Sequence, residues 1–308
     1  MKKYKKIRTL GHRENENIFT VNDDKIIIQE KLDGSNFRFW REGDKLIFGS
    51  RNVNNLDKNN HQFSATINYL KEKIDVDKLD PDIIYIGEAM KKHSINYDWG
   101  NIPKFIGYDV VYKDNGLPLS YKLAIKEFNK IGLEFVRVIF EGTAYEVRNN
   151  IDLNSFLDKD SPYREAGRPE GIVIKNYDRL NQFGRPLYAK MVRDDFKEKN
   201  KVKFDNKKTK KRDALYITEK YATEARIKKI ILKMVNNEGK NLSRELMNSL
   251  IPKVIKDILS ESIIEIYEED KRVNRIDFNM LHELVPKKCL RVLDNMIANN
   301  TNGGVIDG

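Results

Sequence analysis

Residues 30–36 read Glu-Lys-Leu-Asp-Gly-Ser-Asn, and they follow the apolar stretch Lys-Ile-Ile-Ile-Gln at 25–29. The apolar stretch predicts a buried strand, and Asp-Gly-Ser predicts a tight turn directly after it. Lys31 is therefore expected where a buried strand meets a turn. Burial favours the neutral amine of a lysine, which is its nucleophilic form. We interpret Lys31 as a candidate nucleophile, although an isolated Lys-x-Asp-Gly pattern is more often an ordinary strand end.

Short strand patterns continue on both sides of this stretch, up to about residue 195. Turn signals separate apolar and β-branched runs, which predict strands at 25–31, 37–41, 45–51, 83–88, 105–112, 133–139, 171–175 and 187–192. Residues 61–73 and 121–132 carry apolar residues at helical spacing. Many short strands with interspersed helices predict an α+β domain of antiparallel sheets with flanking helices, not a doubly wound parallel sheet.

The sequence pattern changes after about residue 213. From 214 to 298 apolar residues recur every three or four positions, which predicts helices, with breaks at 237–239 and at Pro252. A chain of 308 residues has room for two domains. We expect a catalytic domain at 1–198, a basic linker at 199–213, a small all-helical domain at 214–298 and a disordered tail at 299–308.

The net charge of +10 favours a polyanionic partner. The stretch 197–212 holds nine basic residues against two acidic ones: Lys197, Lys199, Lys201, Lys203, Lys207, Lys208, Lys210, Lys211 and Arg212 against Glu198 and Asp205. Such a stretch suits sequence-independent contacts to nucleic-acid phosphates, and we select Lys207, Lys208, Lys210 and Lys211 as candidate contacts. A solvated linker is an equally good interpretation of the same charges.

The composition also excludes several classes of protein. No apolar run is long enough to span a membrane, and the basic segment 1–10 is not followed by the apolar run of a secretory signal, so we expect a cytoplasmic protein. A single cysteine, Cys289, excludes an internal disulfide. Neither Cys nor His residues occur at the spacing of a structural zinc site.

Five further motifs follow residues 30–36 in a fixed order. They are GSRN at 49–52, IYIGE at 84–88, FIGYDVV at 105–111, EGIVIK at 170–175 and LYAKMV at 187–192. Each motif alone is weak, but their order resembles the covalent nucleotidyltransferase superfamily of ATP-dependent ligases and capping enzymes. The resemblance covers residues 30 to about 198.

The resemblance implies a role for each motif. Lys31 would attack the α-phosphate of ATP and carry AMP. The other catalytic residues would be Glu88, Glu170, Lys175 and Lys190, with Glu170 on the side of a magnesium or manganese ion. Nucleotide contacts would come from Glu30, Arg51, Glu88, Tyr108, Lys175 and Lys190. Among these, Arg51, Lys175 and Lys190 would bind phosphates, Glu88 the ribose and Tyr108 the adenine ring.

Residues 30–37, EKLDGSNF, resemble the phage-type RNA ligases that seal nicks in duplex RNA, in which the asparagine, here Asn36, engages the nucleic-acid end. The run AKMVRDDFKE at 189–198 resembles the junction to the helical domain of that family. The resemblance implies a monomeric ATP-dependent RNA ligase that joins 5′-phosphate and 3′-hydroxyl ends in nicked duplexes through lysyl-AMP and an adenylated end.

One position departs from the family pattern. Relatives carry a second lysine where this chain has Val192, which puts part of the phosphate binding in doubt. Two alternatives stay open: a ligase of DNA or of RNA/DNA hybrids, and a non-catalytic nucleic-acid-binding protein with a ligase fold. A guanylyltransferase is disfavoured, because capping enzymes carry a β-barrel motif that this chain lacks.

Overall fold

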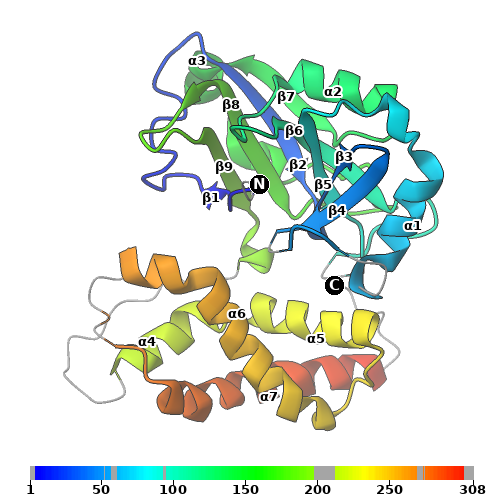
Figure 1. Ribbon diagram of the computed structural model, residues 1–308. Helices are drawn as coiled ribbons and strands as arrows, with labels where there is room; N and C mark the ends of the chain where they lie inside the picture. Colours follow the sequence, from blue (N-terminus) through cyan, green and yellow to red (C-terminus); the bar gives the residue numbers. More distant parts are fainter. Residues whose placement is uncertain are drawn as a thin grey trace. The chain divides into compact units, whose positions relative to one another are not determined.

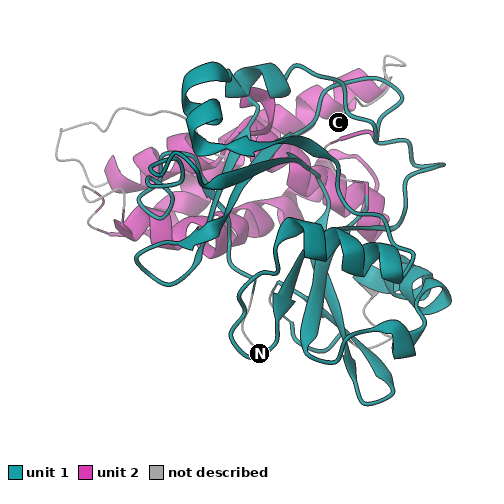
Figure 2. Ribbon diagram, turned by 90° about the horizontal axis from the view of Figure 1, so that it is seen from above, with its two compact units in different colours: residues 1–91, 97–193 teal, residues 92–96, 194–308 magenta. Residues whose placement is uncertain are grey.

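The computed structural model describes residues 4–51, 53–56, 61–92, 95–197, 212–268, 273 and 275–301. The chain forms two compact units (Figure 2). Unit 1 comprises residues 1–91 and 97–193, and unit 2 comprises 92–96 and 194–308. The expected basic linker lies outside the described residues up to residue 211, together with Lys207, Lys208, Lys210 and Lys211.

Sheet A of unit 1 has the strand order β1-β9-β8-β2-β7. Its strands are β1 (Arg8–Thr9), β2 (Lys25–Lys31), β7 (Val138–Thr143), β8 (Gly171–Leu180) and β9 (Pro186–Val192). Neighbouring strands are antiparallel, except that β1 runs parallel to β9. Helix α3 (Ala144–Asn150) and the 3-10 helix η3 (Leu153–Phe156) pack on one face, around the isoleucines of β2 and β8.

Sheet B of unit 1 has the order β4-β3-β5-β6 and is antiparallel throughout. Its strands are β3 (Ser35–Glu42), β4 (Lys45–Ser50), β5 (Ile83–Ala89) and β6 (Phe105–Tyr112). Helices α1 (Ser64–Lys73) and α2 (Tyr121–Lys130) cover its outer face (Figure 1). Burial of Phe39, Leu70 and Phe128 there stabilises the unit by roughly 1.5–3 kcal/mol per side chain.

The strand predicted at 133–139 is wrong in its first half. Only residues from Val138 onward form β7, and the preceding residues cross from one sheet to the other. Gly107 of β6 donates its N–H to Glu134 O (2.8 Å) and accepts from Val136 N (2.7 Å), whereas Glu30 N of β2 donates to Arg137 O (3.3 Å). Both halves of the predicted strand show the same apolar pattern, because each half packs against one of the two sheets.

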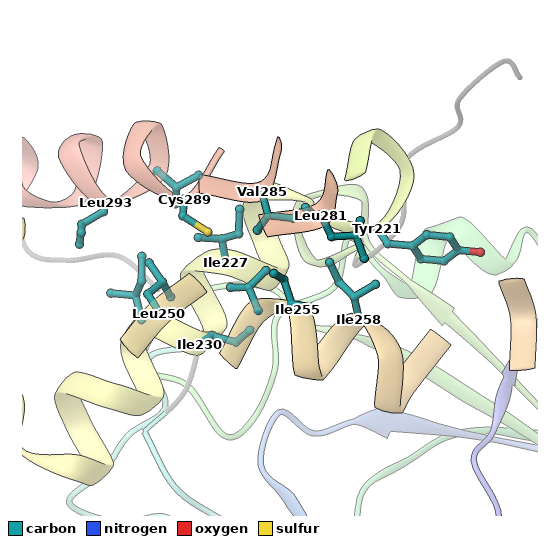
Figure 3. Packing of buried hydrophobic residues seen from close by; sticks show 14 of the residues in the cluster. Tyr221, Ile227, Ile230, Leu250, Ile255, Ile258, Leu281, Val285, Cys289 and Leu293 are labelled. Atoms are coloured by element: carbon teal, nitrogen blue, oxygen red, sulfur yellow. The ribbon is translucent and has the colours of Figure 1, made fainter. Parts of the chain in front are cut away.

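Unit 2 is helical. Its helices are α4 (Arg212–Tyr221), α5 (Glu224–Glu238), α6 (Met247–Glu268) and α7 (Phe278–Thr301). Side chains from all four converge on one apolar core, as Figure 3 shows for Tyr221, Ile227, Leu250, Ile258 and Val285. The fold class predicted from the sequence, α+β with antiparallel sheets followed by helices, is confirmed.

Helix ends in unit 2 follow local sequence, with one exception. The Thr223 side chain accepts a hydrogen bond from Arg226 N and begins α5, and Gly239 ends it in the left-handed region at φ +65°. The break predicted at Pro252 is wrong, because Pro252 lies inside α6. Helix α7 extends to Thr301, and the rest of the predicted tail lies outside the described residues.

The remaining short elements are 3-10 helices. They are η1 (His61–Phe63), η2 (Val76–Lys78), η4 (Asp194–Phe196) and η5 (Arg244–Leu246). Asp75 begins η2, because its side chain accepts a hydrogen bond from Asp77 N.

Candidate active site around Lys31

Lys31 ends β2, a central strand of sheet A. Alternation along the strand places Ile26, Ile28 and Glu30 on the outer face, toward α3, and Gln29 and Lys31 on the opposite face. The Lys31 side chain is 22% exposed, and its Nζ lies 2.5 Å from Glu170 Oε2. A lysine at the end of a buried strand, as the sequence predicted, is therefore accessible and paired with a carboxylate.

Two further acidic residues, Glu88 and Asp33, lie near this pair. Glu88, from β5 of sheet B, accepts a hydrogen bond from Gly34 N at 3.1 Å. Burial raises the pKa of Glu88 to about 7; the charges of Lys31 and Arg51 oppose this rise, and those of Glu170 and Asp33 add to it. The predicted residues Lys31, Arg51, Glu88 and Glu170 thus form one electrostatic cluster, although they come from both sheets.

The turn after Lys31 is held tightly against Glu88. A Cβ at Gly34 would lie 2.6 Å from Ala89 O and 2.6 Å from Glu88 Cγ. Asp33 N donates to the hydroxyl of the buried Tyr97 at 2.7 Å. Glycine is needed at position 34 because of this close approach, which brings the end of β2 beside β5.

Tyr108 lies at a β-bulge in β6. The register shifts so that Gly87 opposes Gly107 while Ile86 opposes Asp109, which leaves Tyr108 as the extra residue. A bulge re-aims side chains that alternation would send to opposite faces. Tyr108 packs with the inner face of sheet B, and Asp109 pairs with Lys175 of sheet A.

Asn36 supports Tyr108. Its Nδ2 donates to the Tyr108 hydroxyl at 2.5 Å, while its buried Oδ1 has no hydrogen-bond partner in the described part of the chain. The contact to nucleic acid implied by the resemblance stays a prediction, and the structure joins Asn36 to the predicted adenine-stacking residue.

Lys175 is buried, and its ammonium is hydrogen-bonded to protein groups. A contact to a phosphate, as predicted, would need an ammonium that is open to the ligand. Its Nζ lies 2.6 Å from Tyr108 O, 3.3 Å from Asp109 Oδ2 and 3.4 Å from the Tyr177 hydroxyl. Burial lowers the pKa of Lys175, and the charge of Asp109 opposes that change. The structure therefore directs Lys175 to the residues that hold Tyr108.

Glu30 is the predicted nucleotide contact that the structure does not bring to the face of Lys31. Its Oε1 accepts a hydrogen bond from Ser161 Oγ at 2.5 Å. Burial raises the pKa of Glu30 to about 7, against the hydrogen bond from Ser161 and the charges of Arg137 and Arg164. Adjacent residues of a strand point to opposite faces, so Glu30 lies on the other face of β2 from Lys31, and its contact to the nucleotide stays a prediction.

Gln29 is the residue on that face that sequence reasoning missed. It is 1% exposed, and its Nε2 has no hydrogen-bond partner among the described residues. A buried amide without a partner is costly unless something else satisfies it. The sequence does hold a signal for it: Gln29 precedes Lys31 by two positions, and residues two apart in a strand lie on the same face.

Lys190 and Val192 lie on β9, two strands away from Lys31. Val192 is opposite Gly171, which is itself opposite Lys31, and Lys190 is opposite Val173 in the next row. Residues in register share a face of the sheet, so Lys190 and Val192 are on the face of Lys31. The position of the missing second lysine is therefore part of the same surface.

A separate cavity of about 420 Å³ opens elsewhere in unit 1. None of the residues predicted to act on the nucleotide lines it. Its lining residues are Asp98, Asn101, Ile102, Pro103, Glu134, Phe135, Arg137, Pro162 and Tyr163.

The family model that matches the chain is described as RNA ligase, and it covers residues 24–192. The chain belongs to the RNA ligase family. That model spans the six motifs, so the family predicted from their order is confirmed, while the phage nick-sealing subtype stays a prediction. A search of curated protein sequences finds no match.

Solved structures resemble this member of the RNA ligase family only distantly. They include an RNA ligase of Naegleria gruberi with pyrophosphate (19% identity over 62% of this chain, TM-score 0.46) and a putative ATP-dependent DNA ligase of Aquifex aeolicus (17% over 98%, TM-score 0.47). An archaeal ATP-dependent RNA ligase matches at 14% identity over 97% of this chain, with a TM-score of 0.46. The chain spans 56%, 68% and 67% of these three proteins.

Within the described residues, no group of three or more His, Cys, Asp and Glu side chains is placed to hold a metal ion. No helix of the described part is long and apolar enough to cross a membrane.

Proposed function

We propose that the chain is an ATP-dependent RNA ligase that works through an adenylate on Lys31. The observation that carries the proposal is the placement of the Lys31 amine on an accessible face, 2.5 Å from Glu170 Oε2 and within the electrostatic cluster of Glu88 and Arg51. A nucleophilic amine next to a carboxylate that can take its proton suits covalent catalysis.

In the first step, Lys31 Nζ forms a bond to the α-phosphorus of ATP. The bond from that phosphorus to the bridging oxygen of pyrophosphate breaks, pyrophosphate leaves, and the lysine proton passes to Glu170. Lys190 and Arg51 offset charge that gathers on the phosphate oxygens. Tyr108 offers a ring to the base, Gln29 offers its unpaired amide to the polar edge of the base, and Glu88 accepts from a ribose hydroxyl.

The residues present also fit a magnesium ion. Magnesium is usually held by one or two carboxylates together with substrate phosphates and water, so Glu170 together with the phosphates of ATP would suffice without further acidic ligands. When bound, the ion would neutralise charge on the phosphates.

In the later steps AMP passes from Lys31 to a 5′-phosphate, and a 3′-hydroxyl displaces AMP to form the phosphodiester. Positioning of two ends on one surface supplies most of the acceleration in such a step. We propose nicked duplex RNA as the substrate, bound by unit 2, which includes the basic stretch 197–212. A monomer in the cytoplasm fits this role.

Mass spectrometry after incubation with ATP and magnesium tests the first step. The wild type should gain the mass of one AMP, whereas Lys31→Ala and Lys31→Arg should gain none. Lys25→Ala is the matched control, since Lys25 is an exposed lysine at the other end of β2. An adduct on either Lys31 variant would remove Lys31 from the role. Sealing of nicked RNA, DNA and hybrid duplexes in parallel then decides between the RNA ligase and its alternatives.

A further inference from the structure

A buried polar cluster lies between the two sheets of unit 1, behind Tyr108. Lys175 from β8 has a side chain that is 1% exposed, and the side chain of Asp109 from β6 is 0% exposed. Tyr177 donates its hydroxyl to Asp109 Oδ1 at 3.3 Å. The rings of Tyr108, Tyr177 and Tyr188 lie 5.1–5.8 Å from Lys175 Nζ.

The ammonium of Lys175 has no donor left for a phosphate. A lysine carries three N–H donors, and Lys175 has three acceptors within reach: Tyr108 O, Asp109 Oδ2 and the Tyr177 hydroxyl. Turning Lys175 toward a nucleotide would leave the Asp109 carboxylate buried without its counter-charge. Breaking a buried pair in this way is strongly unfavourable.

Tyr4 brings the N-terminal segment to the same cluster. Its hydroxyl donates to Asp109 Oδ2 at 2.9 Å, and its ring centroid lies 5.7 Å from that of Tyr108. Burial and the charge of Asp109 hold the pKa of Tyr4 well above its ordinary value, so the hydroxyl keeps its proton and remains a donor. The segment is anchored farther along by β1, which pairs with β9.

We propose that Tyr4, Asp109 and Lys175 are positioning residues that fix the Tyr108 ring as the platform for the base of ATP. Lys175 holds the backbone of Tyr108 through its carbonyl oxygen, Asp109 holds Lys175, and Tyr4 holds both Asp109 and the ring. Asn36 fixes the other end of Tyr108 at its hydroxyl. The inference rests on the proposed function, because it assigns these residues to the same nucleotide site.

The first test replaces Tyr4 by Phe in the full chain, which removes one hydrogen bond and keeps the ring. We measure the Kd for ATP by calorimetry in a Lys31→Ala background, where no chemistry follows, and KM and kcat of adenylation with Lys31 intact. Loss of the hydrogen bond from Tyr4 to Asp109 loosens the support of the Tyr108 ring, so Kd and KM should rise about fivefold to tenfold, which corresponds to about 1–1.4 kcal/mol. The kcat should stay within about twofold.

Tyr112→Phe is the matched control, since Tyr112 is exposed on the same strand as Asp109. An unchanged Kd for Tyr4→Phe would overturn the proposal. A lower Kd would overturn it too, since Tyr4 would then compete with the base.

The second test separates positioning from phosphate binding by Lys175. Lys175→Met strands the carboxylate of Asp109, whereas Lys175→Met with Asp109→Asn removes both charges. If Lys175 acts through Asp109, the double variant should bind ATP at least tenfold more tightly than Lys175→Met. Where the single variant does not fold, the double variant is compared with the wild type and should bind ATP about as tightly. A double variant no better than the single one would show that Lys175 acts on the nucleotide directly.

Wild-type ATP binding without an adduct on Lys31 would remove the proposed function and leave this inference testable by affinity. Absence of ATP binding would remove both.

Discussion

Lys31 and Val192 lie in one row of sheet A, with only Gly171 between them. Neighbouring strands are about 4.8 Å apart, so their backbones are about 10 Å from each other. A side chain at position 192 therefore lies over the same part of the sheet as Lys31, where the resemblance to other ligases leads one to expect a lysine.

Val192→Lys should therefore tighten ATP binding. A second cation on this face adds attraction to the phosphates, and we expect KM for ATP to fall about threefold to tenfold at low salt, with a smaller effect at high salt. Val192→Met is the matched control, because it adds length without charge. An equal effect of both substitutions would show that the charge is not the cause.

Glu170→Ala and Lys190→Ala should each slow adenylation about a hundredfold or more, the scale expected when an electrostatic interaction with a transition state is removed. Single-turnover labelling with ATP measures the rate, and urea unfolding checks that the variants remain folded. Glu165→Ala and Lys25→Ala provide matched controls on exposed residues. Rates near those of the wild type in folded variants would leave Glu170 and Lys190 with a structural role only.

Glu30 should make the protein less stable as the pH rises. Between pH 4.5 and about 7 the folded chain keeps a proton on Glu30 that the unfolded chain has released, so the free energy of unfolding falls over this window. A rise of the pKa from 4.5 to about 7 changes the free energy of unfolding by about 3 kcal/mol over this window.

Glu30→Gln cannot titrate, so urea unfolding at pH 4 and pH 8 should show a smaller loss of stability than in the wild type. Glu88 adds a fall of the same sign, which Glu30→Gln leaves in place. Glu165→Gln serves as the exposed control. The same pH dependence in Glu30→Gln and the wild type would contradict the assignment.

Replacing Lys207, Lys208, Lys210 and Lys211 with Ala should weaken binding to nicked duplex RNA and leave the Lys31 adenylate unaffected. Affinity falls with salt, and removing one ion pair between a lysine and a phosphate makes the slope of log affinity against log salt less steep by about 0.9. Titrations at several salt concentrations measure that slope. An unchanged slope would make the stretch a solvated linker, and the nucleic-acid surface would have to be sought elsewhere on the chain.

The sequence predicted the strand that ends at Lys31 because apolar residues and a turn are local signals. It also predicted helices after residue 213 from their spacing. It did not predict the bulge at Tyr108 or the partners of Lys175, since both depend on which strands become neighbours. Gln29 was missed for a related reason: a glutamine inside an apolar strand is unremarkable until its amide is seen to lack a partner.

Pro252 was misread because the prediction relied on a single residue. A proline removes one backbone donor, but α6 is long and buries Leu250, Val254 and Ile258 on either side of it. Burial of these side chains outweighs the local preference of the proline. Packing also explains the segment 133–139. Its apolar residues pack against the sheets, although its first half is not paired as a regular strand.

The segment that crosses between the sheets fixes the distance between two parts of the proposed nucleotide site. Glu134 and Val136 are tied to Gly107, next to Tyr108, and Arg137 is tied to Glu30, next to Lys31. The distance between the proposed base platform, Tyr108, and the proposed nucleophile, Lys31, is therefore set by a few residues of backbone that are hydrogen-bonded at both ends. One residue inserted there would lengthen it by about 3.3 Å, and a misplacement of about 1 Å already costs about a hundredfold in rate. This segment should therefore tolerate changes of side chain far better than changes of length.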